Sequence, residues 1–359
     1  MKRNLSVLTL VIVIMALLAT ACGGTSGGNS GGSSGGGGGA SSGGEKDGGA
    51  KAGGAKAQYS FKLGHIASNT HNWTKIAQKL GEELKTRSDG RMKLDIFPAG
   101  QLGSEADMVK QVEAGTMEFG FITMGYLSTR VESLNGWFMP FLFKDLPTAV
   151  KMRDSASVKK MMQEVESKLK VNAVDTMFIG NRHVLMKSGV VKSPEDLKGK
   201  KLRILGSPII QDFWKAVGAG PTAMPLPEVY QALQTGVIDG IDIDLDAFMT
   251  GKYYEIAKNL TTTNHMTFNG IAMVSRDKFN KMPPEDQKIV TDAMKAAFDW
   301  GAKEAVRLED ANLQDLKAKG VNVVQLQNSE TFNAVKDEIY KKYTANPLIK
   351  EFVDEANKK

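Results

Sequence analysis

The chain has 359 residues, enough for two domains, and its hydrophobic fraction of 42% and charged fraction of 24% are those of a globular protein. Its formal net charge is +6, but lysine and arginine alternate with acidic residues and form no dense basic run with aromatics, which argues against nucleic-acid binding. A single cysteine excludes a disulfide framework and a cysteine metal site, and the four histidines lack HExxH spacing, so we expect no metal and no cofactor.

The first 21 residues have the pattern of a signal peptide. Lys2 and Arg3 precede an apolar run over residues 5–18, and small residues follow, directly before Cys22. This ending resembles a lipobox, although Ala19 stands where that pattern prefers leucine. We therefore predict that the chain is cleaved before Cys22 and carries a lipid on its thiol. An incidental cysteine behind an ordinary signal peptide is the alternative.

Residues 22–57 are almost entirely glycine, serine, alanine and lysine. Such a composition cannot bury apolar surface and predicts a flexible tether with a reach of roughly 30–35 Å.

A series of strands and helices follows the tether. The Ser104 and Asp107 pair predicts a capped helix start, and other turn signals divide the segments similarly. We predict strands over residues 59–66, 92–97, 118–123 and 171–179, and helices over residues 74–87, 104–115, 147–154 and 157–168. Strands that alternate with helices predict a largely parallel α/β sheet, which the chain leaves after residue 179.

The stretch from Lys192 to Leu245 carries the main functional pattern. Residues 201–205 alternate like a strand and place Arg203 on the face opposite Leu202 and Ile204. Two helices punctuated by prolines follow, and an acidic strand over residues 237–244 completes the stretch. Neighbouring strand ends would offer an arginine and several carboxylates to one cleft, where α/β sheets commonly bind ligands.

The remaining chain predicts a strand over residues 266–274, a helix over 283–319, a strand over 321–326 and two short amphipathic helices. The long helix would measure roughly 50 Å, too much for one small domain.

The segments DLKGKKLR and GAGPTAMPLPEVYQALQTGVIDG resemble the signature of TRAP-transporter solute receptors of the DctP type. The resemblance extends through FKLGHI, FPAGQLGSEADMVKQVEAGTMEFGF and MPFLF to the C-terminal helices, leaving out only about the first 57 residues. It implies an extracytoplasmic receptor, not an enzyme, that captures an organic acid for a membrane permease. It also implies a two-lobed periplasmic-binding-protein-like α/β fold with hinge strands, a long spanning helix and closure around the ligand. We assign residues 58–180 and 269–308 to lobe I, and residues 181–268 and 309–359 to lobe II.

The resemblance also implies the ligand site. Arg203 would bind a ligand carboxylate, because the guanidinium fork donates two parallel hydrogen bonds and stays charged. Arg182, just past the strand that ends at residue 179, would belong to the same site. Further contacts fall at Thr123 and Tyr126 after the third strand, and near His65 and Asn72 after the first; Trp214 is expected in the core.

One departure from the family pattern concerns the ligand. Many relatives have an asparagine that touches ligand where this chain has Ile243. Alternation would place Asp242 and Asp244 on the opposite face from Ile243, so we expect Asp242 to meet ligand hydroxyls in the cleft. This predicts a hydroxylated monocarboxylate such as a sugar acid. A C4-dicarboxylate is the alternative ligand, and both aspartates could instead be solvated or cap a helix.

Two other functions stay open. Asp239, Asp242 and Asp244 could serve a secreted hydrolase or lyase as acid, base or metal ligands. The receptor could also feed a sensor or another importer.

Overall fold

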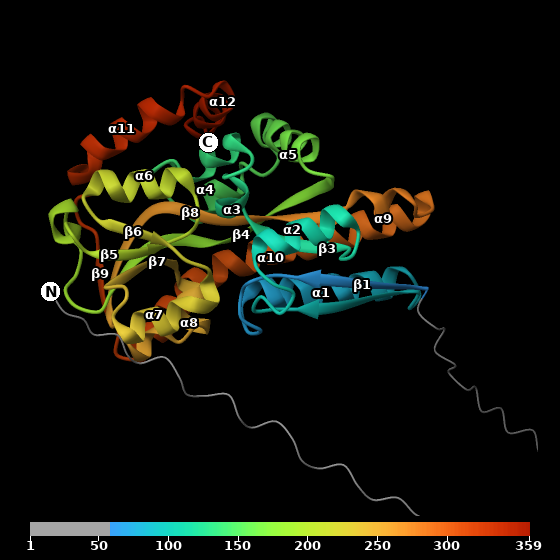
Figure 1. Cartoon of the computed structure of the whole chain (residues 1–359), viewed down its shortest axis with the longest axis horizontal. Coiled ribbons are helices and arrows are strands. Elements are labelled where there is room, and N and C mark those ends of the chain that lie inside the picture. The colour runs from blue at the N-terminus through green and yellow to red at the C-terminus, as the bar shows by residue number, and fades with distance from the viewer. Residues whose placement is uncertain (1–57) are drawn as a thin grey trace, which may run out of the picture. The chain divides into compact units, whose positions relative to one another are not determined.

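A nine-stranded mixed sheet organises the part of the chain that this computed structural model describes, residues 58–359 (Figure 1). The predicted signal peptide, Cys22 and the tether lie outside the described residues. The strands are β1 (Tyr59–Gly64), β2 (Met92–Phe97), β3 (Phe119–Thr123), β4 (Val171–Met186), β5 (Lys201–Ile204), β6 (Gly220–Ala223), β7 (Gly240–Asp244), β8 (Asn259–Ser275) and β9 (Asn322–Gln325).

The strand order is β2-β1-β3-β8-β4-β7-β5-β6, with β9 paired to β8. The long strands β4 and β8 pair with each other over almost their whole length. The end of β8 from Gly270 to Val274 also pairs with β3, whereas its beginning, from Asn259 to Thr262, pairs with β9. On β4, it is the last five residues that pair with β7. The two strands therefore connect a first group of strands (β1–β3) to a second (β5–β7 and β9).

The expectation of a largely parallel sheet holds within each group and for β9, which pairs in parallel with β8. β1 pairs in parallel with β2 and β3, and β5 does so with β6 and β7. The connecting strands are antiparallel to each other, to β3 and to β7, because the chain crosses along β4 and returns along β8. The predicted strand end at residue 179 was also wrong, since β4 continues to Met186 through register shifts.

Helices cover both faces of the sheet. Figure 1 shows α6 and α11 above β5 and β6, and α7 and α8 below them. The α-helices are α1 (Asn72–Arg87), α2 (Glu105–Ala114), α3 (Met124–Leu127), α4 (Leu146–Val150), α5 (Ala156–Lys168), α6 (Pro208–Val217), α7 (Val229–Thr235), α8 (Leu245–Thr250), α9 (Arg276–Asn280), α10 (Pro284–Ala318), α11 (Asn333–Tyr343) and α12 (Pro347–Ala356). The 3-10 helices are η1 (Glu132–Phe138), η2 (Pro194–Leu197), η3 (Leu226–Glu228), η4 (Tyr253–Glu255) and η5 (Ser329–Phe332).

The predicted long helix is present as α10, which has 35 residues and is therefore about 52 Å long. It packs against α1 near the first group of strands and against α8 near the second, and β4 lies along it. Its residues Ala297, Phe298 and Ala305 are buried. α10 therefore spans both groups, as predicted.

The lobe boundaries at residues 180, 268 and 308 stay predictions. The two groups of strands correspond to the segments assigned to lobes I and II, and we keep those names for them. The last helix, α12, packs against α5 and η1, which belong to segments assigned to lobe I, although residues 309–359 were assigned to lobe II.

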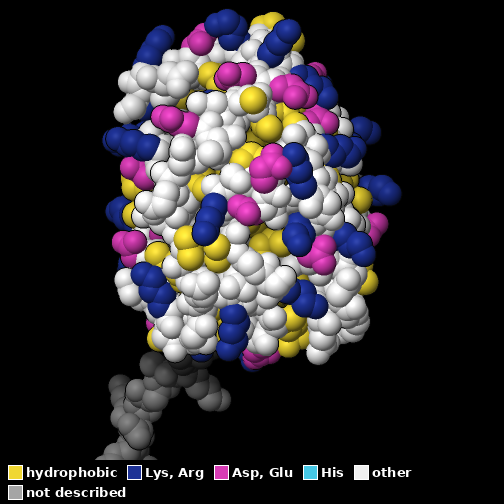
Figure 2. Space-filling view, turned by 90° about the vertical axis from the view of Figure 1, so that its left-hand side faces the viewer, with side chains coloured by type: hydrophobic (Ala, Val, Ile, Leu, Met, Phe, Trp, Pro, Cys, Tyr) yellow, Lys and Arg dark blue, Asp and Glu magenta, His cyan; other side chains and the backbone are white. Residues whose placement is uncertain are grey.

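The surface carries both signs of charge. Figure 2 shows Lys and Arg side chains interspersed with Asp and Glu over the face that it displays. Within residues 58–359, no helix combines the length and apolar character needed to span a membrane.

Candidate functional site

A cavity of about 430 Å³ lies between the two lobes. Lobe I contributes the loop before α2, the first turn of α2 and Tyr126 of α3, and lobe II contributes the end of β5 and the segment from Ala223 to Glu228. Its wall is mainly apolar, with Ile66, Leu205, Met224 and Leu226 among its residues. We call this space the large cavity. Its volume is in the range of pockets that enclose small molecules.

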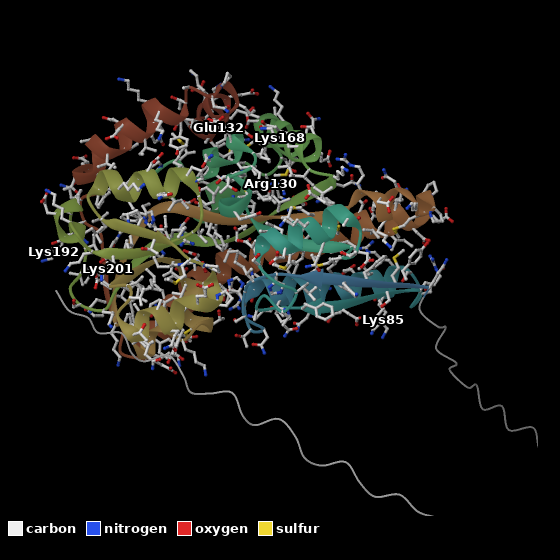
Figure 3. All side chains as sticks on the ribbon, in the orientation of Figure 1. Lys85, Arg130, Glu132, Lys168, Lys192 and Lys201 are labelled. Atoms are coloured by element: carbon white, nitrogen blue, oxygen red, sulfur yellow. The ribbon has the colours of Figure 1, made fainter. Side chains whose placement is uncertain are left out.

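Arg203 on β5 reaches this cavity from a buried position. Only 1% of the residue is exposed. Its Nε and Nη2 donate hydrogen bonds of 2.9 and 2.7 Å to the carbonyl oxygen of Met224, whereas its Nη1 has no hydrogen-bond partner among residues 58–359. Figure 3 shows Lys201 of the same strand at the outer surface, so a solvated cation and an enclosed one lie only two positions apart along β5.

The electrostatics of Arg203 favour an incoming anion. None of the described carboxylates lies within ion-pair distance of its guanidinium, and burial, followed by the nearby Arg182 charge, lowers its pKa to about 10. The side chain is therefore still cationic at neutral pH. Because an enclosed cation without a counter-charge is costly, a carboxylate placed against Nη1 would stabilise it.

A second, small cavity of about 10 Å³ adjoins the first and shares Ile66, Arg203, Leu205 and Leu226 with it. It has room for about one water molecule at most. Its other lining residues come from the connecting strands β4 and β8, from the end of β7, and from the start of α1 with the loop before it: Ala67, His71, Trp73, Arg182, Ile243, Asp244 and Phe268.

Arg182 differs from Arg203 because the protein itself neutralises it. Its Nε donates to Asp242 Oδ1 and its Nη2 to the Asp242 carbonyl oxygen, while its Nη1 lies 3.8 Å from Asp244 Oδ2. The guanidinium also sits 5.2 Å from the centre of the Phe268 ring. Arg182 lines the small cavity, but its fork is already occupied.

Asp242 does not face the cleft, contrary to the expectation from strand alternation. It is fully buried and lines neither cavity. Besides Arg182, its carboxylate accepts a 2.7 Å hydrogen bond from Trp214 Nε1 and lies 3.3 Å from His265 Nε2. Burial raises the pKa of Asp242, but Arg182 and His265 outweigh this effect and hold it below its usual value. The buried Trp214 thus belongs to the core, as expected, and also fixes this carboxylate.

The other two aspartates of the hydrolase alternative also have local roles. Asp244 Oδ1 accepts the Ala247 N–H at 2.8 Å and caps α8, which was one of the alternatives left open. Asp239 Oδ2 accepts the Lys201 N–H at 2.8 Å. Across residues 58–359, no three His, Cys, Asp or Glu side chains are grouped so as to hold a metal ion.

Of the four lobe I candidates, only Tyr126 borders the large cavity. Thr123 caps α3 by accepting the Tyr126 N–H at 3.0 Å. His65 is buried with its Nε2 3.2 Å from Thr74 Oγ1, and Asn72 is buried at the start of α1. Thr123, His65 and Asn72 therefore lie behind the cavity wall.

Glu105 is a cavity residue that the sequence analysis missed. Its Oε1 accepts the Thr123 N–H at 2.6 Å and its Oε2 accepts the Thr123 hydroxyl at 3.1 Å. Burial raises the pKa of Glu105 to about 7, although both hydrogen bonds from Thr123 lower it. Each carboxylate oxygen keeps a further acceptor position. The capping box of Ser104 and Asp107 was recognised, and it holds Glu105 at the first helical position, but only the fold places Thr123 beside it.

Comparisons with known proteins agree with this architecture. The model of the family described as "DctP: Bacterial extracellular solute-binding protein, family 7" matches residues 63–346. The sialic acid-binding periplasmic protein SiaP of Vibrio cholerae is 28% identical over 291 residues, which cover 81% of this chain and 90% of that protein.

Two solved structures extend the similarity to the whole described fold. A TRAP periplasmic solute-binding protein of Sulfitobacter sp. NAS-14.1 with bound β-D-galacturonate has 26% identity and a TM-score of 0.77, and the match covers 82% of this chain and 98% of that one. A TRAP periplasmic solute-binding protein of Sulfurospirillum deleyianum with bound succinate has 27% identity and a TM-score of 0.77, covering 83% of this chain and 99% of that one.

These matches confirm the two-lobed α/β fold and the resemblance on which the sequence analysis relied. The family model spans far more than half of the chain and includes every residue that lines the large cavity. The chain therefore belongs to family 7 of the bacterial extracellular solute-binding proteins, the DctP-type receptors of TRAP transporters.

Proposed function

We propose that this protein captures a hydroxylated monocarboxylate, such as a sugar acid, in the large cavity and delivers it to a TRAP-type permease. The observation that carries the proposal is Arg203, an enclosed cation whose Nη1 has no hydrogen-bond partner in residues 58–359. A ligand carboxylate there would supply the missing anion and receive a charge-assisted hydrogen bond.

Glu105 supports the choice of a hydroxylated ligand. Glu105 lines the lobe I wall of the large cavity, and Arg203 lines the lobe II wall. Glu105 would therefore accept the hydrogen bonds from ligand hydroxyls that were expected to go to Asp242. Hydroxyl groups of the ligand can donate to the Glu105 carboxylate. A second ligand carboxylate would meet like charge, which costs several kcal/mol where water is excluded.

Ile243 supports the same choice. It is buried and lines the small cavity with an apolar side chain, at the position where the family resemblance implies an asparagine that touches ligand. The amide contact is therefore missing on lobe II.

The relatives support an organic acid but divide on its kind. The similar structures hold galacturonate in one case and succinate in the other. We keep a C4-dicarboxylate as the second candidate because of the succinate complex. A sensor-linked binding protein would use the same cleft. Permease genes adjacent to the gene of this protein would favour the transport function over the sensor function.

The location of the receptor belongs to the proposal as well. A lipid on Cys22 and the following tether would hold the receptor at the outer side of the cytoplasmic membrane, close to its permease. We do not propose a nucleic acid as a partner of this protein.

A thermal-shift screen would test the ligand class. Uronates and aldonates should raise the unfolding midpoint, whereas succinate, malate and fumarate should raise it less at the same concentration. Each ligand should be tested with and without calcium. A cation that bridges Glu105 and a second ligand carboxylate would allow the cavity to bind a dicarboxylate. Stabilisation by a dicarboxylate alone would overturn the assignment to hydroxylated acids.

A further inference from the structure

One carboxylate connects the two lobes beside the small cavity. Asp246 on α8 accepts the backbone N–H of Asn72, the first residue of α1, at 2.7 Å through its Oδ2. The same oxygen lies 3.3 Å from Nε2 of His71. Asp246 is 5% exposed and His71 is 1% exposed, so water is largely excluded from the contact.

The contact completes the N-terminus of α1. This helix has no acidic residue in its first turn, and its cap is His71, whose Nδ1 accepts the Trp73 N–H at 3.1 Å. The next free amide, that of Asn72, receives its acceptor from Asp246, 174 positions away in the chain. An anion at this end of a helix is stabilised by the unpaired N–H groups and by the helix dipole.

The two helices are attached to different lobes. α1 packs against β2 of lobe I, whereas α8 packs against β7 of lobe II and against β4, and both helices contact the spanning helix α10. His71 and Asp244, the cap of α8, both line the small cavity between the arginines. The Asp246 contact therefore joins a helix of lobe II to the N-terminus of a helix of lobe I, beside the small cavity.

We propose that Asp246 is a closure latch, a carboxylate that docks on His71 and on the first amide of α1 when the lobes close. The inference rests on the proposed function, because it requires lobes that open and close around a ligand. The latch touches neither the large cavity nor Arg203. It should therefore strengthen binding of every ligand by the same factor and slow reopening, without selecting among ligands.

The test compares Asp246→Ala, Asp246→Asn and the control Glu255→Gln in the full chain. Glu255 is an exposed acidic residue of the same lobe that accepts a hydrogen bond from Tyr230. The dissociation constant and dissociation rate are measured for D-galacturonate and for succinate. We expect Asp246→Ala to weaken binding and speed dissociation by about tenfold, as for loss of a charged helix cap. Asp246→Asn, which keeps one acceptor oxygen, should show about threefold, and Glu255→Gln none.

Distances between the lobes give a second, ligand-independent measurement. Spin labels at Lys85→Cys and Lys192→Cys, in a Cys22→Ser background, report on positions that Figure 3 shows at the outer surface of α1 and of lobe II. Asp246→Ala should shift the unliganded distribution toward longer distances than in the unmodified background.

The outcomes separate the latch from other roles. Unchanged distances and dissociation rates, with only a lower unfolding midpoint, would overturn the latch and leave Asp246 as a structural cap. A change in the galacturonate-to-succinate ratio would overturn it in favour of ligand contact. If the wild-type protein binds no organic acid, the proposed function fails, and the distance measurement alone decides on the latch.

Discussion

Replacing Arg203 tests the ligand site, because this residue is a buried cation whose Nη1 no described residue engages. In the ligand-free protein, Arg203→Ala removes two hydrogen bonds to the Met224 carbonyl but also removes the cost of enclosing a charge. These effects oppose each other, so we expect the free energy of unfolding to change by only about 1 kcal/mol.

Ligand binding should respond far more strongly to the same change. Truncating one partner of a buried charge pair costs about 2–5 kcal/mol, which corresponds to about 30-fold to several thousand-fold in Kd. Arg203→Lys should recover only part of this, because an ammonium group cannot hold the Met224 carbonyl and a carboxylate in the same fork geometry. Calorimetric titration with galacturonate measures both variants. Wild-type affinity in Arg203→Ala would refute the reasoning.

Three further predictions concern other residues. Arg182→Ala should lower the free energy of unfolding by about 3–5 kcal/mol even without ligand, because it leaves Asp242 buried without its cation. Denaturant titration measures this change. A loss of ligand binding without a loss of stability would contradict the prediction. Because burial raises the pKa of Glu105 to about 7 and ligand hydroxyls bind its ionised form, affinity for a sugar acid should rise from about pH 6 to pH 8. Glu105→Gln should weaken binding and flatten that profile, and a profile unchanged in the variant would exclude Glu105 as its source. Cys22→Ser should move the protein from the membrane to the soluble fraction; equal membrane retention would rule out the lipid anchor.

The sequence predicted the elements whose signals are local. The capping box at Ser104 and Asp107, the Arg203 strand and the long helix over residues 283–319 all appear within a residue or two of their predicted bounds. Each depends on propensity or periodicity along a short segment, which tertiary context did not override.

Elements fixed by pairing between distant segments were harder to predict. β6 was missed because Gly220–Ala223 contains a proline and lacks alternation, both of which an edge strand tolerates. Likewise, alternation along residues 237–244 could not show that Arg182 of β4 would lie against Asp242 and neutralise it. Glu105 was overlooked because its partner Thr123 lies 18 residues later, on another strand.

A calorimetric titration of the wild-type protein with D-galacturonate, D-galactose and succinate tests the central claim most directly. Galacturonate has both the carboxylate for Arg203 and the hydroxyls for Glu105, whereas galactose lacks the carboxylate and succinate lacks the hydroxyls. We predict that galacturonate binds much more tightly than either of the others. Binding of galactose as tightly as galacturonate, or submicromolar binding of succinate alone, would contradict the account.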